Sequence, residues 1–125
     1  MKLLRKSTWT NVAVSLSLGI FLSACSSKQS VKLSIYTEPE GSHVVYMVTQ
    51  AESEKPSPWI YLGVTPYKGA TLFDDDDLDS DDTIQIKVMR NGYLDQIKEW
   101  NGEQFLEEAE DKGMIFWTPR LVKSE

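Results

Sequence analysis

Apolar and polar residues alternate along much of the chain, which is the pattern of half-buried β-strands. The clearest case is residues 83–90. There, Ile84, Ile86 and Val88 predict a buried face, and the polar residues between them predict the opposite face. Residues 31–36 alternate in the same way. We expect further strands at residues 43–49, 59–62, 70–73, 94–100 and 114–118, with a last edge piece at Leu121 and Val122.

Turn residues and one acidic stretch interrupt this alternation. Asn91-Gly92 is the strongest short hairpin signal and predicts a reversal between the two strands that flank it. Residues 103–112 contain good helix formers with an acidic first turn, and Gly113 suits the position after a helix. We predict a short helix there, with an exposed acidic loop as the alternative. The elements together predict a mainly β protein, a small antiparallel β-sandwich with one short C-terminal helix.

The first 24 residues have the pattern of a secretory signal peptide. Lys2, Arg5 and Lys6 precede an uncharged apolar run at residues 12–22, and small residues follow it. The run has 11 residues, whereas a helix that spans a bilayer needs about 20. The alternative is a buried N-terminal helix, which the polar residues just before the run make a poor prediction. We therefore expect residues 1–24 to be removed from the mature protein.

The end of this segment, Leu22-Ser23-Ala24-Cys25, resembles the lipobox of bacterial lipoproteins. The resemblance implies that the Cys25 thiol receives a diacylglycerol, that the chain is cut before Cys25, and that the new amine is acylated, with palmitate as a usable label. Two or three acyl chains hold a soluble domain on a membrane, while one anchors it only marginally. Ser26 resembles an outer-membrane sorting signal, because Asp at that position retains Gram-negative lipoproteins at the inner membrane. The resemblance therefore implies an outer-membrane anchor, a short tether at residues 25–30 and a domain in the periplasm.

Charge and cysteine content exclude several other classes. The chain has 125 residues, enough for one domain, and a net charge of −6. Loss of residues 1–24 removes three positive charges and no negative one, so the mature chain carries −9. Such an acidic balance argues against nucleic-acid binding, which requires a basic face. A single Cys forms no internal disulfide and no multi-cysteine zinc site.

Three short motifs in the expected domain, residues 31–125, resemble those of PEGA domains. They occur in the family's order and are Pro39-Glu40-Gly41-Ser42, Gly63-Val64-Thr65-Pro66 and Arg90-Asn91-Gly92-Tyr93. PEGA domains are small β modules of envelope proteins, and no common enzymatic activity is attached to them. The resemblance therefore implies a non-catalytic β module. This chain departs from the family by a long loop before Trp59, by the acidic loop at residues 74–82, and by the tail from Glu103 onward.

The residues offer little for catalysis. His43 is the only histidine, no cysteine remains free after lipidation, and no Ser is directed at His43 by the sequence, so we predict no enzyme. The acidic loop suits a hard cation such as Ca²⁺, which prefers oxygen ligands. Its candidate ligands are Asp75, Asp77, Asp79 and Asp81. Ser80 and Ile86 stand where an EF-hand needs Gly and Glu, so the loop is not an EF-hand. A solvated, self-repelling loop is the alternative.

Aromatic residues are numerous, with four Trp and five Tyr. Trp59, Tyr61, Trp100 and Trp117 are candidates for stacking on sugars or contacting a partner, and equally for filling a small core. An exposed pair of Trp59 and Tyr61 would favour binding. We therefore expect a membrane-anchored envelope lipoprotein whose β module contacts another envelope protein or a cell-wall polysaccharide. The alternative function is divalent-cation binding through the acidic loop.

Overall fold

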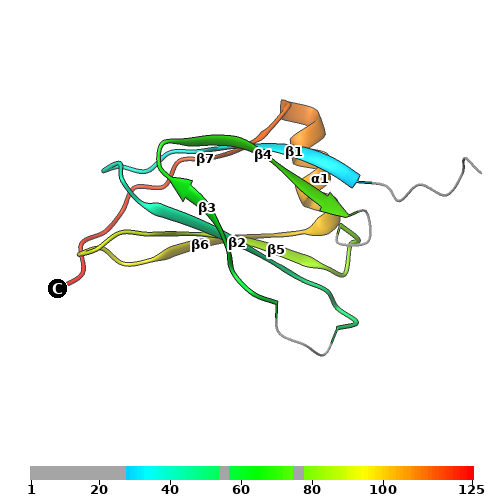
Figure 1. Ribbon diagram of the computed structural model, residues 1–125, viewed down its shortest axis with the longest axis horizontal. Coiled ribbons are helices and arrows are strands. Elements are labelled where there is room, and N and C mark those ends of the chain that lie inside the picture. Colours follow the sequence, from blue (N-terminus) through cyan, green and yellow to red (C-terminus); the bar gives the residue numbers. More distant parts are fainter. Residues whose placement is uncertain (1–27, 54–56, 75–77) are drawn as a thin grey trace, which may run out of the picture.

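In the part of the chain that the structure describes, seven strands form two sheets that face each other (Figure 1). The computed structural model describes residues 28–53, 57–74 and 78–125. One sheet has the order β4-β1-β7, and the other has the order β3-β2-β5-β6. A helix, α1, leads from β6 in one sheet to β7 in the other. The bounds are β1 Lys28–Ile35, β2 His43–Thr49, β3 Ile60–Val64, β4 Tyr67–Asp74, β5 Thr83–Met89, β6 Gln96–Asn101, α1 Gly102–Lys112 and β7 Ile115–Trp117. The mainly β sandwich with one short helix is confirmed.

Strand pairing is antiparallel with one exception. β1 pairs antiparallel with β4 and parallel with β7, where Leu33 lies opposite Ile115. The two parallel strands are far apart in the chain, and α1 brings the chain from β6 back to this sheet, where β7 pairs with β1. No helix in the described part of the chain is long and apolar enough to cross a bilayer.

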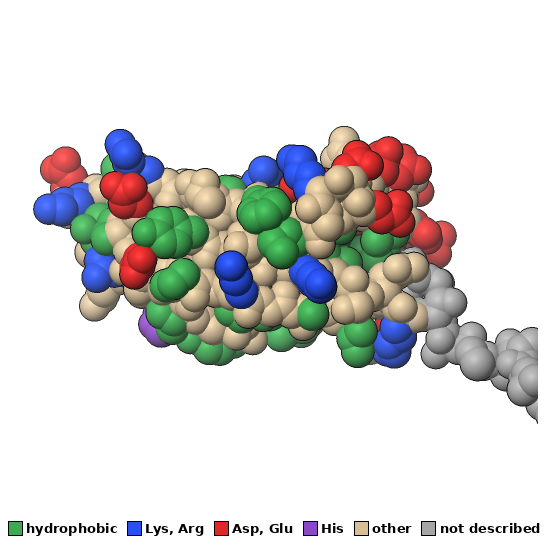
Figure 2. Space-filling model, turned by 90° about the horizontal axis from the view of Figure 1, so that it is seen from above, with side chains coloured by type: hydrophobic (Ala, Val, Ile, Leu, Met, Phe, Trp, Pro, Cys, Tyr) green, Lys and Arg blue, Asp and Glu red, His purple; other side chains and the backbone are tan. Residues whose placement is uncertain are grey.

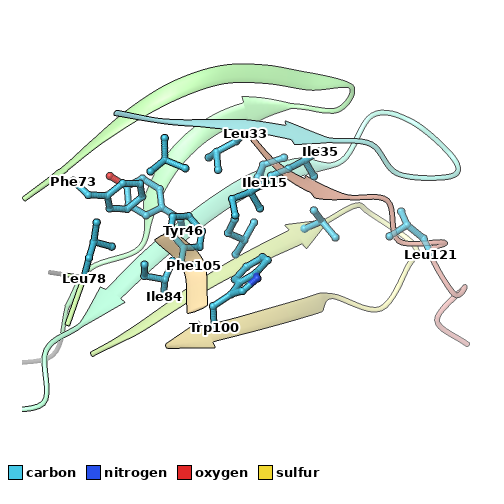
Figure 3. Packing of buried hydrophobic residues seen from close by; sticks show 14 residues of the cluster. Leu33, Ile35, Tyr46, Phe73, Leu78, Ile84, Trp100, Phe105, Ile115 and Leu121 are labelled. Atoms are coloured by element: carbon cyan, nitrogen blue, oxygen red, sulfur yellow. The ribbon is translucent and has the colours of Figure 1, made fainter. Parts of the chain in front are cut away.

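The core lies between the sheets and is filled from both by alternate residues. Ile84, Ile86 and Val88 of β5 are buried as their spacing predicts. Four aromatic side chains cross the interior in edge-on contacts (Figure 3). Their ring centroids lie 5.6 Å apart for Tyr46–Phe73, 5.4 Å for Phe73–Phe105 and 5.4 Å for Phe105–Trp100. Such contacts add to the free energy gained by burying the rings.

Helix α1 begins and ends with capping residues. The Asn101 side chain accepts a hydrogen bond from the Gln104 backbone N–H at 2.8 Å, and the Gln104 side chain accepts one from the Asn101 N–H at 3.4 Å. This capping box satisfies two N–H groups that have no partner inside the helix. Gly113 takes the left-handed conformation, with φ of 80°, directly after the last turn. Phe105 anchors the helix in the core and is 0% exposed. The helix prediction is confirmed, and the alternative of an exposed loop is wrong.

Several strand bounds differ from the expected ones. β1 begins at Lys28, so residues 28–30 of the expected tether belong to a strand that pairs with β4. β3 ends at Val64, because a bulge in its pairing with β2 keeps Gly63 and Val64 in the ladder rather than breaking it. β4 is longer than residues 70–73 because the whole of β1 pairs with it. Pairing with other strands sets these bounds, and the local sequence does not predict that pairing.

The reversal after β5 also differs from a two-residue hairpin. β6 begins at Gln96 instead of residue 94, because the C-terminal segment pairs with the connection. The Leu94 N–H donates to the Val122 carbonyl at 2.8 Å, and the Ser124 N–H donates to the Gly92 carbonyl at 3.0 Å. Leu121 and Val122 form no strand, although the Leu121 N–H donates to the Glu38 carbonyl at 2.9 Å. Gly92 adopts a positive φ of 84°, as its turn requires.

Three motifs that are distant in the sequence meet at one end of the sandwich. The Thr65 hydroxyl lies 2.6 Å from the Thr37 hydroxyl and accepts hydrogen bonds from the backbone N–H groups of Ser42 at 2.9 Å and Gly41 at 3.1 Å. Gly41 has a φ of 99°, and the Arg90 side chain lies against it. This positive φ lets Gly41 reverse the chain between β1 and β2. Residues of all three motifs therefore join the two sheets at this end.

Candidate binding face

The outer surface of the four-stranded sheet carries a row of large side chains. The register places Tyr61 of β3 opposite Val45 of β2, Val45 opposite Lys87 of β5, and Lys87 opposite Ile97 of β6. Paired residues point to the same side of a sheet. Val45 does not belong to the core cluster, because its side chain is on the outer side of the sheet. It is nevertheless buried, since the neighbouring side chains cover it. We call this surface, centred on Trp59 and Tyr61, the aromatic face.

Two predicted residues are exposed on this face. Trp59 is 37% exposed and Tyr61 is 56% exposed. The Lys87 ammonium lies 4.3 Å from the centre of the Trp59 ring, a cation–π contact that fixes the indole against the sheet. The Tyr61 hydroxyl lies 3.0 Å from Nδ1 of His43. Both rings are therefore held in place while much of their surface meets solvent.

The polarity of the face changes along the strands. At one end, the register aligns Val64, His43 and Met89. Beyond the central row, the Gln85 amide donates to the Glu99 carboxylate at 2.8 Å. The last row brings together Thr49, Thr83 and Asn101. An aromatic centre beside polar groups is the composition of many binding surfaces.

The other two candidate aromatics do not belong to this face. Trp100 is buried in the core, and its indole N–H donates to the Glu108 carboxylate at 3.1 Å. Trp117 is half-buried and packs against the core. Of the four aromatic residues that the sequence offered as candidates for binding, these two pack in or against the core instead. The neighbours Lys87, His43 and Ile97 were missed as site residues, although strand alternation already placed Lys87 opposite the core.

A hollow of about 490 Å³ adjoins the aromatic face near His43. Met89 and the turn at residues 90–93 line it, together with Asp95. The Arg90 guanidinium lies 5.4 Å from the centre of the Tyr93 ring. Tyr93 is partly buried and packs against the core. Since His43 belongs to both, this hollow extends the aromatic face toward the end where the three motifs meet.

The described part of the acidic loop packs beside α1. Asp79 and Asp81 share a hollow of about 570 Å³ with Glu103, Glu107 and Glu110. Figure 2 shows acidic side chains gathered at one end of the molecule. We call this group of five residues the acidic end. Like charges so close together repel one another and attract cations without selecting one.

Asp82 has a structural role in this loop. Its carboxylate is 6% exposed and accepts hydrogen bonds from the backbone N–H groups of Ala51 and Asp79, both at 3.2 Å. Its backbone carbonyl accepts one from Gly102 at 3.0 Å. Asp82 therefore ties the loop to the start of α1. The sequence pattern did not distinguish it from the other aspartates.

Two candidate calcium ligands, Asp75 and Asp77, lie outside the described residues. Asp79 and Asp81 are exposed. Within the described ranges, no group of three His, Cys, Asp or Glu residues is arranged to hold a metal ion. Calcium binding therefore stays a prediction. The lipidation and sorting residues, Cys25 and Ser26, also lie outside the described part of the chain.

No family model, curated protein or solved structure matches the chain. The resemblance to lipoproteins and to PEGA domains therefore rests on the residues quoted above.

Proposed function

We propose that this chain is an outer-membrane lipoprotein, anchored through Cys25, with a non-catalytic PEGA-like module in the periplasm that binds another envelope protein or a cell-wall polysaccharide. The aromatic face is its binding surface. The observation that carries the proposal is the exposure of Trp59 and Tyr61, at 37% and 56%, on the outer side of the four-stranded sheet.

Physical chemistry supports binding at these residues. Aromatic side chains bury a large area at a low cost in conformational entropy, and Trp and Tyr are enriched at the centres of interfaces. The cation–π contact with Lys87 and the hydrogen bond with His43 hold the rings before any partner arrives. Such preorganisation lowers the cost of association.

Affinity capture from solubilised membranes tests the binding surface. The double variant Trp59→Ala/Tyr61→Ala is expected to lose a stoichiometric partner protein, or to lose binding to purified cell-wall polymer. Leu72→Ala/Phe116→Ala is the control, because it removes two apolar side chains of 64% and 49% exposure from the other sheet. Equal capture by both double variants and the parent chain would contradict the assignment.

A separate experiment tests the anchor. Metabolic labelling with palmitate is expected to mark the parent chain and to leave Cys25→Ala unlabelled. Ser26→Asp is expected to keep the label while the protein moves from the outer-membrane to the inner-membrane fraction. Label that persists on Cys25→Ala would refute the lipid site. An unchanged membrane distribution of Ser26→Asp would refute the sorting role alone.

A further inference from the structure

The outer surface of the three-stranded sheet is the second large face of the sandwich. Alternation along β1 exposes Lys28, Ser30 and Lys32 on it. Alternation along β4 exposes Lys68, Ala70, Leu72 and Asp74. The register places Ser30 beside Leu72, Lys32 beside Ala70, and Ser34 beside Lys68. Because paired residues point to the same side, these side chains share one flat surface.

This surface is positively charged, in contrast to the chain as a whole. The Lys28 ammonium and the Asp74 carboxylate form a salt bridge of 2.8 Å, which neutralises one positive charge. Lys32 and Lys68 are exposed, and neither forms a salt bridge within residues 28–53, 57–74 and 78–125. Among these residues the surface therefore keeps two unpaired positive charges, although the chain as a whole has a net charge of −6. Figure 2, which looks onto this layer, shows basic side chains across the middle and at one end, and most of the acidic ones at the other end.

Apolar side chains stand beside the lysines. Leu72 is 64% exposed, and Phe116 of β7 is 49% exposed. The register pairs Phe116 with Ser34, which is itself paired with Lys68. Lysines next to exposed apolar and aromatic groups are the composition of surfaces that lie on phospholipid headgroups. We call this surface the basic face.

The position of the proposed lipid anchor indicates what this face contacts. Cys25 precedes Lys28, the first residue of β1, by three residues. Three residues span at most about 10 Å, which is close to the distance over which salt screens charges. A lipid on Cys25 therefore holds the start of β1, at Lys28, within electrostatic range of the bilayer. We propose that the basic face lies on anionic phospholipid headgroups, an inference that rests on the proposed lipid anchor.

This orientation leaves the aromatic face free. The two faces belong to opposite sheets of the sandwich, so contact of one with lipid turns the other toward the periplasm (Figure 1). Two lysines near an anionic surface favour the facing orientation by roughly thirtyfold.

Site-specific labels on the lipidated protein test the orientation. After lipidation of Cys25 an introduced cysteine is the only free thiol, so an environment-sensitive fluorophore reports one position. Ser30→Cys places the label on the basic face, and Thr49→Cys places it on the opposite sheet. Each protein is reconstituted in phosphatidylethanolamine vesicles with and without phosphatidylglycerol. The label at position 30 is expected to shift to a less polar environment in anionic vesicles only, and the label at position 49 to stay unchanged.

Charge variants supply the matched comparison. Lys32→Gln/Lys68→Gln is expected to abolish the shift at position 30, and high salt is expected to weaken it. Lys112→Gln/Lys123→Gln makes the same change in net charge at exposed residues off the basic face and is expected to preserve the shift.

Three results would overturn the proposal. The first is equal response at positions 30 and 49. The second is a shift that is the same in neutral vesicles or in the Lys32→Gln/Lys68→Gln variant. The third is a shift at position 30 on self-association in detergent without lipid, which would assign the face to a second copy of the chain. Vesicle flotation distinguishes these failures from failure of the anchor, because a protein that does not float has no lipid, whatever its orientation.

Discussion

At the scale of single residues, buried side-chain hydroxyl groups hold together the end of the sandwich where the three motifs meet. Thr37, Ser42 and Thr65 are 0%, 0% and 4% exposed, and their oxygens lie within hydrogen-bonding distance of one another or of buried backbone N–H groups. These segments contain Gly and Pro, which are common in turns. The sequence did not indicate the hydroxyl network, because Thr and Ser are common in exposed loops and their burial depends on residues far along the chain.

Thr65→Val tests this network with a nearly equal volume. The change removes the acceptor of two backbone N–H groups and leaves the Ser42 N–H buried without that partner. We expect the free energy of unfolding to fall by about 1–3 kcal/mol. Denaturant unfolding measures it, with Thr49→Val on the exposed side of β2 as the control. A loss at Thr65 no larger than that at Thr49 would contradict the structural role of the network.

Tyr36 gives the molecule one pH-dependent interaction. A hydrogen bond to the Glu40 carboxylate raises the pKa of the Tyr36 phenol above its ordinary value of 10.0, and the negative charges of Glu40 and Glu38 add to the shift. The pKa of Tyr36 is higher in the folded chain than in the unfolded chain. The interaction therefore contributes its full stabilisation of the fold below about pH 10, and this stabilisation is lost as the pH rises through the folded pKa. Glu40→Gln is expected to lower the pKa of Tyr36.

Difference absorption of tyrosinate measures this shift, and subtraction of the Tyr36→Phe titration isolates the single residue. A Tyr36 pKa that does not move in Glu40→Gln would show that the hydrogen bond is not its cause.

Among the elements, α1 has the closest fit to its surroundings. Its first residue, Gly102, is buried against the backbone of Leu78 and Asp79, and a Cβ there would overlap both. The acidic loop thus passes directly over the start of the helix, and Asp82 ties the two together. The sequence predicted the helix from its formers and caps. It could not predict that Gly102 serves close packing, since the contact joins segments more than twenty residues apart.

Gly102→Ala distinguishes the effect of packing from that of helix propensity, because the two predict opposite changes in the free energy of unfolding. Propensity favours Ala over Gly by about 1 kcal/mol within a helix. Overpacking against the Leu78 backbone costs about 1–3 kcal/mol. We expect a net loss of stability in thermal and denaturant unfolding, with the neighbouring exposed change Glu103→Ala as the control. A more stable Gly102→Ala protein would show that the loop does not hold the helix start.

For the molecule as a whole, the two sheets present surfaces of different chemistry. Period-two alternation predicted which side of β1 and β5 is buried, and so part of each outer face followed from the sequence. Pairing order did not, because the parallel β1–β7 contact and the C-terminal segment beside Gly92 join distant parts of the chain. Exposure of Trp59, which directly precedes β3, and burial of Trp100 in β6 also depend on sheet order.

The acidic end is the remaining whole-molecule feature, and salts distinguish its two interpretations. Glu103 and Glu107 are four residues apart on α1, and Asp79 and Asp81 face the same hollow. Like charges at this helical spacing destabilise by about 0.2–0.5 kcal/mol for each pair, and any salt screens them. We therefore expect NaCl and CaCl₂ of equal ionic strength to raise the melting temperature equally. An additional rise in millimolar CaCl₂, accompanied by heat of binding and lost in Asp79→Asn/Asp81→Asn, would contradict simple screening and establish divalent-cation binding at this loop.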